Sequence, residues 1–117
     1  MDIFTTTVYQ SLTLKQGADI AIKHRLYISG WALSRTLQKL RTTSCTHDRI
    51  AIGSLNDIPV AIAILYEGGA QAFCRKKHRR NGYAGACVRA LRSRMMVASI
   101  GIHGSEHFWS RHNVTLV

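Results

Sequence analysis

Apolar residues alternate with small or polar ones in two neighbouring stretches near the middle of the chain, residues 49–55 and 58–66. Between them lies Asn56-Asp57, two residues that tolerate positive φ, so the pattern predicts a tight β-hairpin. In the second stretch the larger residues Ile58, Val60, Ile62 and Ile64 alternate with Pro59, Ala61, Ala63 and Leu65. A strand with small residues on one face predicts a helix packed closely against that face.

Helical spacing replaces this alternation between about residue 14 and residue 41. Large apolar side chains recur there at intervals of four, seven, four and three residues, at Ile22, Leu26, Leu33, Leu37 and Leu40. These intervals place them along one face of a helix. Ser29-Gly30 interrupts the face, so we expect two helices or one broken helix, with the joint at Gly30. A β-branched and aromatic stretch at residues 3–9 predicts a strand before them.

Shorter strand and helix signals follow in the second half of the chain. Residues 70–74 predict a short strand, and a basic loop that contains glycine comes after it. A helix is expected from Gly85 to about Met95, then a strand over 97–102, then a short helix from about Glu106. This order predicts an α/β, or layered α+β, fold with a mixed central sheet flanked by helices.

Neither a targeting segment nor a membrane span is visible in the sequence. The chain opens without the basic and apolar regions of a secretory signal. Its longest apolar stretch, 58–66, has about nine residues, whereas a helix that crosses a bilayer needs roughly 20. Three cysteines, Cys45, Cys74 and Cys87, form no CxxC pair, which is usual for reduced intracellular proteins. We expect one cytoplasmic domain over residues 1–117, with no membrane contact.

Positive charge changes the picture of what this domain binds. The chain has 16 Lys and Arg against 6 Asp and Glu, a net charge of +10, while 46% of its residues are hydrophobic. Such a chain is not a disordered tail, and it needs an anionic partner: a phosphate-rich ligand, an acidic protein surface or nucleic acid. Because no helix-turn-helix, zinc-finger or RNP pattern occurs, nucleic acid is the weaker alternative.

Half of the positive side chains lie in one stretch of 20 residues, from Arg75 to Arg94. No acidic residue occurs between Glu67 and Glu106. Within this block Gly82 has no Cβ to keep an anion from the backbone, and the helix that follows begins with unpaired N–H groups at the positive end of its dipole. The loop and the helix start therefore predict an anion site of the kind that binds phosphate.

The same loop carries a resemblance to a known family. Arg79 to Ala84 fit the Q/R-x-x-G-x-G/A signature of the GNAT N-acetyltransferases, with Arg79, Gly82 and Ala84 in the first, fourth and sixth positions. Phe73-Cys74 resembles the strand end before that loop, and the hairpin resembles the second and third strands of the family. Residues 103–114 are similar to its later strand-to-helix segment. The chain thus resembles a minimal GNAT domain whose sheet stops after the last helix.

The resemblance implies acetyl-CoA as co-substrate and transfer of its acetyl group to an amine of a small molecule or protein. The cofactor-binding residues that it implies are Phe73, Cys74, Arg75, Arg79, Arg80, Asn81, Gly82, Tyr83, Ala84 and Gly85. Amides of the residues from Arg80 to Gly85 would hold the pyrophosphate, and the pantetheine arm would lie between splayed strands at 72–74 and 99–102. A backbone N–H at Cys74 or Arg75 would stabilise the oxyanion.

Two departures from the family pattern concern catalysis and the edge of the sheet. Many relatives have a tyrosine that protonates the leaving thiolate, but here the matching position holds Trp109, whose indole is a poor acid. Other candidates for the catalytic acid or base are Ser110, His107, His103, Glu67 and Glu106. The sixth and seventh strands of the family have no counterpart after Val114, so we expect an exposed edge that pairs in a homodimer or a partner complex.

Two interpretations compete with that of an enzyme. A catalytically degenerate GNAT fold would serve as a binding or inhibitory module for an acidic protein, as the missing tyrosine and the high charge suggest. The basic block would alternatively bind nucleic acid, with an affinity that falls steeply with salt. We expect no metal: Cys74 and His78, or His103 and His107, have helical spacing, but cations flank His78 and no CxxC or HExxH occurs.

Overall fold

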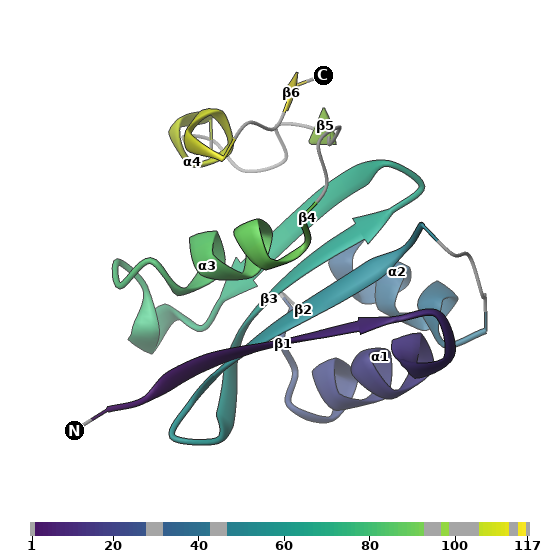
Figure 1. Ribbon diagram of the computed structural model, residues 1–117, viewed down its shortest axis with the longest axis horizontal. Helices are drawn as coiled ribbons and strands as arrows, with labels where there is room; N and C mark the ends of the chain where they lie inside the picture. The colour runs from purple at the N-terminus through teal and green to yellow at the C-terminus, as the bar shows by residue number, and fades with distance from the viewer. Residues whose placement is uncertain are drawn as a thin grey trace.

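A mixed sheet of six strands, in the order β1-β2-β3-β4-β5-β6, runs through the molecule (Figure 1). The computed structural model describes residues 2–27, 32–42, 47–92, 97–98, 106–112 and 115–116. The elements in chain order are β1 (Phe4–Gln10), η1 (Ser11–Thr13), α1 (Leu14–Lys23), α2 (Ala32–Leu40), β2 (Arg49–Leu55), β3 (Ile58–Tyr66), β4 (Gly69–Cys74), η2 (Lys76–His78), α3 (Tyr83–Ala90), β5 (Val97–Ala98), α4 (Glu106–Arg111) and β6 (Thr115–Leu116).

The first four strands are antiparallel neighbours, and the predicted hairpin lies at their centre. β2 and β3 have the predicted bounds, and Leu55 pairs with Ile58 across the turn. Asn56 and Asp57 adopt φ values of 51° and 68°. Positive φ at both turn residues gives a twist that matches the twist of the flanking strands, so the hairpin prediction is confirmed.

Helices cover both faces of this antiparallel part (Figure 1). On one face α1 and α2 bury a cluster with the sheet, which includes Leu14, Leu26, Leu37, Leu40, Ile50, Ile62 and Ile64. On the other face α3 packs through Cys87, Val88 and Leu91 onto a surface that contains Ala61 and Ala63. The small residues of β3 therefore lie under a helix, as its alternation predicted.

Gly53 in β2 lets β1, β2 and α3 meet closely on this second face. A Cβ at Gly53 would lie 2.4 Å from Cζ of Phe4 and 2.9 Å from Sγ of Cys87. Phe4 in turn stacks on Tyr83 at the start of α3, with ring centroids 4.1 Å apart and planes inclined by 8°. The missing side chain at Gly53 thus makes room for the ring that supports the first turn of α3.

Arg49 fixes the other end of α3. Its Nη1 donates to the carbonyl of Leu91 and, at 3.3 Å, to that of Arg92. These carbonyls have no partner within the helix, because a helix leaves its last carbonyls unpaired, and a cation there complements the negative end of the dipole. β1 and β2 therefore hold α3 at both ends.

The structure differs from the sequence predictions at two places. α3 begins at Tyr83 rather than Gly85, because Gly82, and not a later residue, is the N-cap. β6 pairs in parallel with β5 after α4, whereas no strand was expected beyond the last helix. A strand of two residues shows no alternation, so its pattern could not be recognised. The predicted joint at Gly30, the helix end near Met95 and strand residues 99–102 lie outside the described residues.

No helix in the described ranges has the length and apolar character needed to cross a bilayer.

Candidate functional site

The basic loop connects β4 to α3 and ends at a glycine with a left-handed backbone. Gly82 is the N-cap of α3, with φ of 77° and ψ of 12°. Other residues adopt such a φ only with strain, so glycine suits the position. A Cβ built there meets no atom within 4 Å. The helix start thus faces open space at the point where a side chain would otherwise project.

The first turn of α3 offers hydrogen-bond donors to that space. The helical bonds begin with the amide of Ala86, which donates to the carbonyl of Gly82 at 3.0 Å. The amides of Tyr83, Ala84 and Gly85 have no acceptor among the residues that the structure describes, and no side chain caps them. Unpaired N–H groups at the positive end of a helix dipole favour an anion.

Side chains of the loop stabilise its backbone. Nε of Arg79 donates to the carbonyl of Cys74 at 3.0 Å, and its guanidinium lies 5.8 Å from the ring centroid of Phe73. Nδ2 of Asn81 donates to the carbonyls of His78 and Arg79, at 3.0 and 3.4 Å. The motif's first residue therefore ties the loop to the end of β4, and its third residue closes the turn before Gly82.

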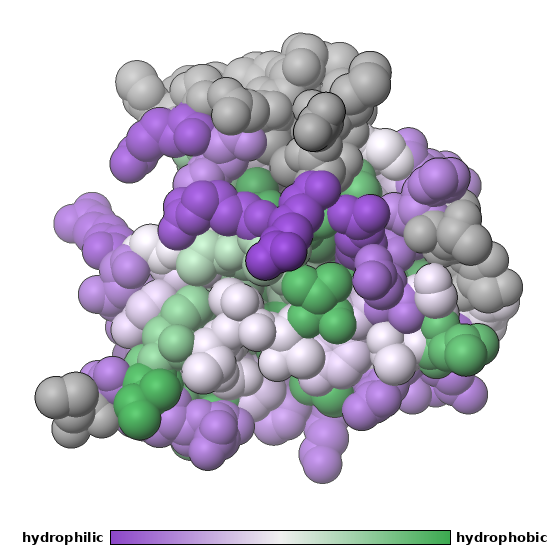
Figure 2. All heavy atoms as spheres, in the orientation of Figure 1, coloured by the Kyte–Doolittle hydropathy of each residue, from purple (hydrophilic) through white to green (hydrophobic). Residues whose placement is uncertain are grey.

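Exposed cations lie in the loop and along α3 after it. Lys76, Lys77, Arg80, Arg89 and Arg92 are exposed. Figure 2 shows hydrophilic side chains gathered over the part of the face where Figure 1 draws α3 and the loop before it. Arg75 is different, because its guanidinium donates to the carbonyl of His24 after α1. The cations around the loop raise the local positive potential that an anion would meet.

The described pairing between β4 and β5 lies at the end of β4 that is farther from this loop. The two strands are parallel neighbours, yet their described pairing consists of Gly69 with Val97. β4 continues to Cys74, so its last five residues have no β5 partner in the described part of the chain. The sequence predicted splayed strands at 72–74 and 99–102. The first of these segments is unpaired on its β5 side, and the second lies outside the described residues.

The ladder also shows which way the backbone of β4 points. The amide of Arg75 donates to the carbonyl of Val60 in β3 at 2.9 Å. Because amides alternate along a strand, those of Cys74 and Ala72 point away from β3, toward the side of the sheet on which β5 lies. Of the two amides predicted to stabilise an oxyanion, that of Arg75 is thus engaged with β3, and that of Cys74 faces the unpaired side.

α4 packs against the outer side of α3 at a second glycine. Gly85 is buried, and a Cβ there would lie 2.7 Å from Nε2 of His112. Phe108 contacts the rings of Trp109 and His112, with centroids 4.8 and 4.9 Å away. Trp109 is only 7% exposed and belongs to the cluster under α3. Gly85 and Trp109 therefore contribute to the packing of α4.

His112 makes this packing sensitive to pH. Desolvation, and then the charges of Arg89 and Arg111, lower the pKa of His112 below its usual 6.5. The unfolded chain therefore binds the proton more readily, so the free energy of unfolding falls as pH decreases from 6.5 through the lower folded pKa. We expect urea unfolding of the His112→Gln variant to lose this part of the pH dependence between about pH 7.5 and 5.5. An equal loss in the variant with the exposed His47 replaced by Gln, or none in His112→Gln, would contradict this assignment.

The solved structures most relevant to this arrangement are acetyltransferases. The aminoglycoside N-acetyltransferase AAC(6')-Iy, solved with CoA, superposes with a TM-score of 0.63 at 11% identity, over 97% of this chain and 89% of that one. A possible acetyltransferase from Clostridium difficile 630 gives 0.59 at 8% identity, over 97% and 91%. The ribosomal-protein-alanine N-acetyltransferase from Brucella melitensis biovar Abortus 2308 gives 0.50 at 11% identity, over 76% and 69%.

The chain has the GNAT acetyltransferase fold. The fold that the loop motif implied is thereby confirmed. No protein-family model matches the sequence, and no curated protein is similar to it in sequence. At sequence identities of 8–11%, the similarity to GNAT structures is one of backbone arrangement. The chemistry therefore has to be argued from this chain's own residues.

The GNAT fold brings only some of the predicted site residues together. Phe73, Cys74, Arg79 and Gly82 meet at the loop, while Tyr83 turns its ring toward Phe4 and Ala84 packs on the cluster under α3. Glu67 lies in the β3–β4 turn, where its amide donates to the buried carboxylate of Asp48 at 3.1 Å. β4 separates Glu67 from the loop by about 16 Å, at roughly 3.3 Å per residue.

Other candidates for catalysis are placed in part or not at all. Ser110, His107 and Glu106 belong to α4, although their side chains are not among those described. His103 lies outside the described residues. The two buried cysteines, Cys74 and Cys87, are poor nucleophiles, because burial raises the pKa of both thiols, that of Cys87 to about 12.

Three residues at the site escaped the sequence analysis: Phe4, Arg49 and His112. Phe4 and Arg49 lie in strands far from the loop in sequence, and no local pattern connects them to α3. His112 lies in the segment 103–114, which the sequence analysis treated only as a whole. The sequence shows a glycine at position 85, directly after the loop motif. The structure explains this glycine, because a Cβ there would meet the ring of His112.

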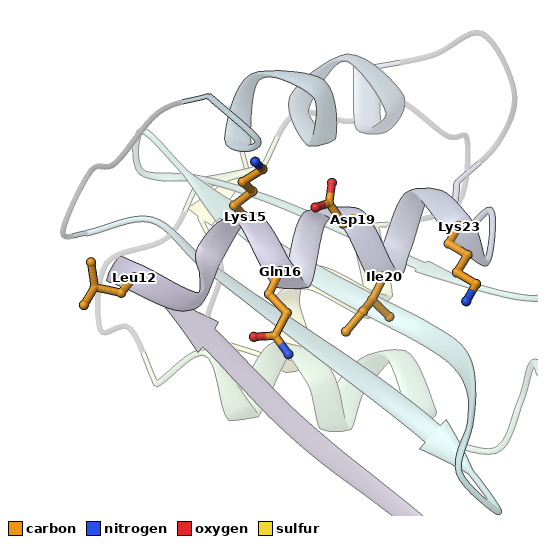
Figure 3. A pocket seen from close by; sticks show the side chains of 6 residues that line it. All are labelled: Leu12, Lys15, Gln16, Asp19, Ile20 and Lys23. Atoms are coloured by element: carbon orange, nitrogen blue, oxygen red, sulfur yellow. The ribbon is translucent and has the colours of Figure 1, made fainter.

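A shallow hollow on the opposite face of the sheet does not belong to this site. Figure 3 shows its lining side chains, Leu12, Lys15, Gln16, Asp19, Ile20 and Lys23, all from η1 and α1. α1 packs on the face that α3 does not cover. A hollow lined by a single exposed helix side encloses little of a ligand, so we assign it no function.

Proposed function

We propose that this chain is an acetyl-CoA-dependent N-acetyltransferase that acts on an amine of a small molecule or a protein. The observation that carries the proposal is the start of α3: three amides without a partner in the described part of the chain and an open glycine, among exposed cations and next to the end of β4. A diphosphate needs such donors and such charge, and the extended arm attached to it needs an unpaired strand edge.

The loop residues fit the phosphate part of acetyl-CoA. The amides of Tyr83, Ala84 and Gly85 would hold the pyrophosphate, and Gly82 would let it approach because no Cβ intervenes. Arg80 and Lys76 are exposed beside the loop and would add charge. The backbone groups of Ala72, which point away from β3, would bond to the amide groups of the pantetheine arm, which leaves the amide of Cys74 for the acetyl group.

The chemistry that this placement supports is mostly backbone chemistry. An uncharged amine would attack the thioester carbonyl, and the amide of Cys74 would donate to the oxyanion that forms. Collapse of this intermediate would break the C–S bond, and the proton lost by the nitrogen would pass through water to the departing thiolate. Trp109 is buried in the packing of α4, so no acid is assigned to its position. The step does not require one, because a thiolate, whose conjugate thiol has a pKa of about 8.5, is a tolerable leaving group at neutral pH.

Release of thiol from acetyl-CoA tests the enzymatic part of the proposal. The acceptors should include an aminoglycoside and an alanine peptide with a free amine, because the names of two proteins with this fold mention an aminoglycoside and ribosomal-protein alanine. We expect thiol release above the rate without protein, together with an acetylated amine of matching amount by mass spectrometry. Thiol release without acetylated amine would indicate hydrolysis and would contradict the transfer.

Substitution of Arg79 distinguishes the effect of its hydrogen bond from the effect of its charge. Arg79→Met removes the hydrogen bond to the carbonyl of Cys74 but keeps an apolar side chain beside Phe73. We expect acetyl-CoA affinity to fall by about tenfold or more, because hydrogen bonds from charged groups are worth roughly 1.5–3 kcal/mol. Lys76→Met removes the same charge from an exposed neighbour and should cost clearly less. Equal losses in both variants would mean that Arg79 contributes only its charge.

A second candidate function is binding without catalysis, in which the fold serves an acidic protein partner. The burial of Trp109 at the position expected for the acid favours it. Acetyl-CoA binding with no thiol release for any amine, together with capture of a stoichiometric acidic protein that high salt releases, would support this function over the enzyme.

A further inference from the structure

β1 is an edge strand that lacks the usual protection against pairing. It lies at one border of the sheet, on the side away from β4, β5 and β6 (Figure 1). Edge strands commonly avoid association by means of lysine, proline, a bulge or short length. β1 spans seven residues, FTTTVYQ, pairs with β2 without a break in register, and contains none of these residues.

Charge and exposed apolar side chains single out the same strip. No charged residue occurs between Asp2 and Lys15, although the chain carries a net charge of +10. The exposed large apolar side chains of the described ranges are Ile3, Val8, Leu12 and Ile58. Three of them come from this uncharged segment. Figure 2 shows pale and green residues along the strip where Figure 1 draws β1.

The ladder shows which backbone groups of β1 are unused. The amide of Asn56 donates to the carbonyl of Ile3 at 2.9 Å. The backbone N–H and C=O groups of the odd-numbered residues of β1 therefore point toward β2, and those of the even-numbered residues point away from it. Gln10 is satisfied locally, because its amide donates to Oγ1 of Thr13 and its carbonyl accepts from the same hydroxyl. The outward groups of Phe4, Thr6 and Val8 have no partner among the described residues.

The three residues with outward backbone groups are spaced evenly about Thr6, so this edge can pair with the same edge of a second copy. We infer that two copies of the chain pair antiparallel through β1, with a twofold axis at Thr6, and join their sheets into one. Thr6 then faces Thr6 of the second copy, and Phe4 faces Val8. All three outward residues fall in hydrogen-bonded pairs in this register, and aromatic with β-branched residues is a favourable pairing across strands.

A second copy fits this edge better than an acidic partner would. Two bodies of charge +10 repel each other, and contact is least unfavourable through a segment without charge. An acidic partner would instead bind at the cations around the loop. A closed twofold contact also covers the exposed edge in both copies at once. The inference is independent of the proposed acetyltransfer, since no residue of the loop takes part.

Proline at Thr6 tests the pairing without breaking the sheet. The amide of Thr6 points away from β2, so Thr6→Pro removes the central outward donor and leaves the ladder with β2 intact. By sedimentation we expect a dimer for the unmodified chain and an association about tenfold weaker, or weaker still, for Thr6→Pro, because both central hydrogen bonds are lost. Thr6→Val keeps the amide and should remain dimeric. Circular dichroism would check that both variants are folded.

A crosslink tests the register. Residues in a hydrogen-bonded antiparallel pair have Cα atoms about 5.5 Å apart, within reach of a disulfide. Thr6→Cys should therefore form a covalent dimer on mild oxidation, whereas Thr42→Cys, at another exposed threonine, should not exceed the unmodified chain. A monomer at all concentrations, or a dimer that survives Thr6→Pro without crosslinking at Thr6→Cys, would overturn the inference.

Discussion

Gly82→Glu is expected to abolish binding of acetyl-CoA while leaving the protein folded. The new side chain would project into the open space before α3 and place a carboxylate where the pyrophosphate should lie. Steric exclusion and repulsion between like charges each cost on the order of 1–3 kcal/mol, so affinity should fall by at least about thirtyfold. Isothermal titration calorimetry of the variant against the unmodified chain measures the loss.

Gly68 supplies a matched control for this substitution. It also has a left-handed backbone, with φ of 80°, and a Cβ there meets nothing within 4 Å, but it lies in the β3–β4 turn. Gly68→Glu introduces the same strain and the same charge away from the loop, so it should bind acetyl-CoA almost normally. Gly82→Ala should lie between the two, because it adds strain and one methyl group without charge. Equal affinity in Gly82→Glu and Gly68→Glu would place the ligand elsewhere.

Gly53→Ala is expected to have the largest effect on stability. The added Cβ would meet both the ring of Phe4 and the thiol of Cys87 at less than 3 Å. Relief requires the Phe4 ring to leave Tyr83 or α3 to move off the sheet. Overpacking of this kind costs typically 1–3 kcal/mol, and we expect urea unfolding to show a loss of about 2 kcal/mol.

Two comparisons isolate the cause of that loss. Gly69→Ala places a Cβ 3.3 Å from a single carbonyl oxygen, that of Tyr66, and should change stability by less than about 1 kcal/mol. Phe4→Leu combined with Gly53→Ala should cost less than the sum of the two single changes, since a smaller side chain makes room. If the two effects simply add, the Phe4 ring is not the group that opposes the new Cβ.

The local elements of this fold could be predicted from the sequence, because each depends on residues that are neighbours along the chain. Asn56-Asp57 specifies a turn through the φ values that these residues tolerate, and the alanines of β3 predicted a covering helix because alternation maps directly onto faces. Boundaries were less accurate. The start of α3 is decided by the backbone of Gly82, and helix ends depend on such caps more than on apolar spacing.

The loop could be predicted for the same local reason, whereas its supports could not. Arg79, Asn81 and Gly82 lie within four residues, and their bonds run within the loop or to the adjacent strand end. Phe4, Arg49 and His112 reach α3 from β1, β2 and the end of α4, and no sequence pattern pairs residues across such separations. Of the catalytic candidates, Glu67 lies in the β3–β4 turn and Trp109 is buried in the packing of α4, and the loop motif itself contains no residue that specifies a proton donor.

The clustering of charge gives the loop its strongest physical argument. The exposed cations near α3 exceed what one bound pyrophosphate would neutralise, so binding of acetyl-CoA should weaken as salt is raised, and the protein should retain affinity for other anions. Displacement of bound acetyl-CoA by inorganic pyrophosphate would show that both ligands occupy the loop. Independent binding of the two would mean that the cations around α3 form a second anion site.

Calorimetric titration of the unmodified chain with acetyl-CoA tests the central claim most directly. We predict one binding site per chain, an affinity in the micromolar range or tighter, roughly −8 kcal/mol, and weaker binding for dephospho-CoA and for free pantetheine, which lacks the pyrophosphate. Absence of measurable binding with acetyl-CoA at millimolar concentration would contradict the claim.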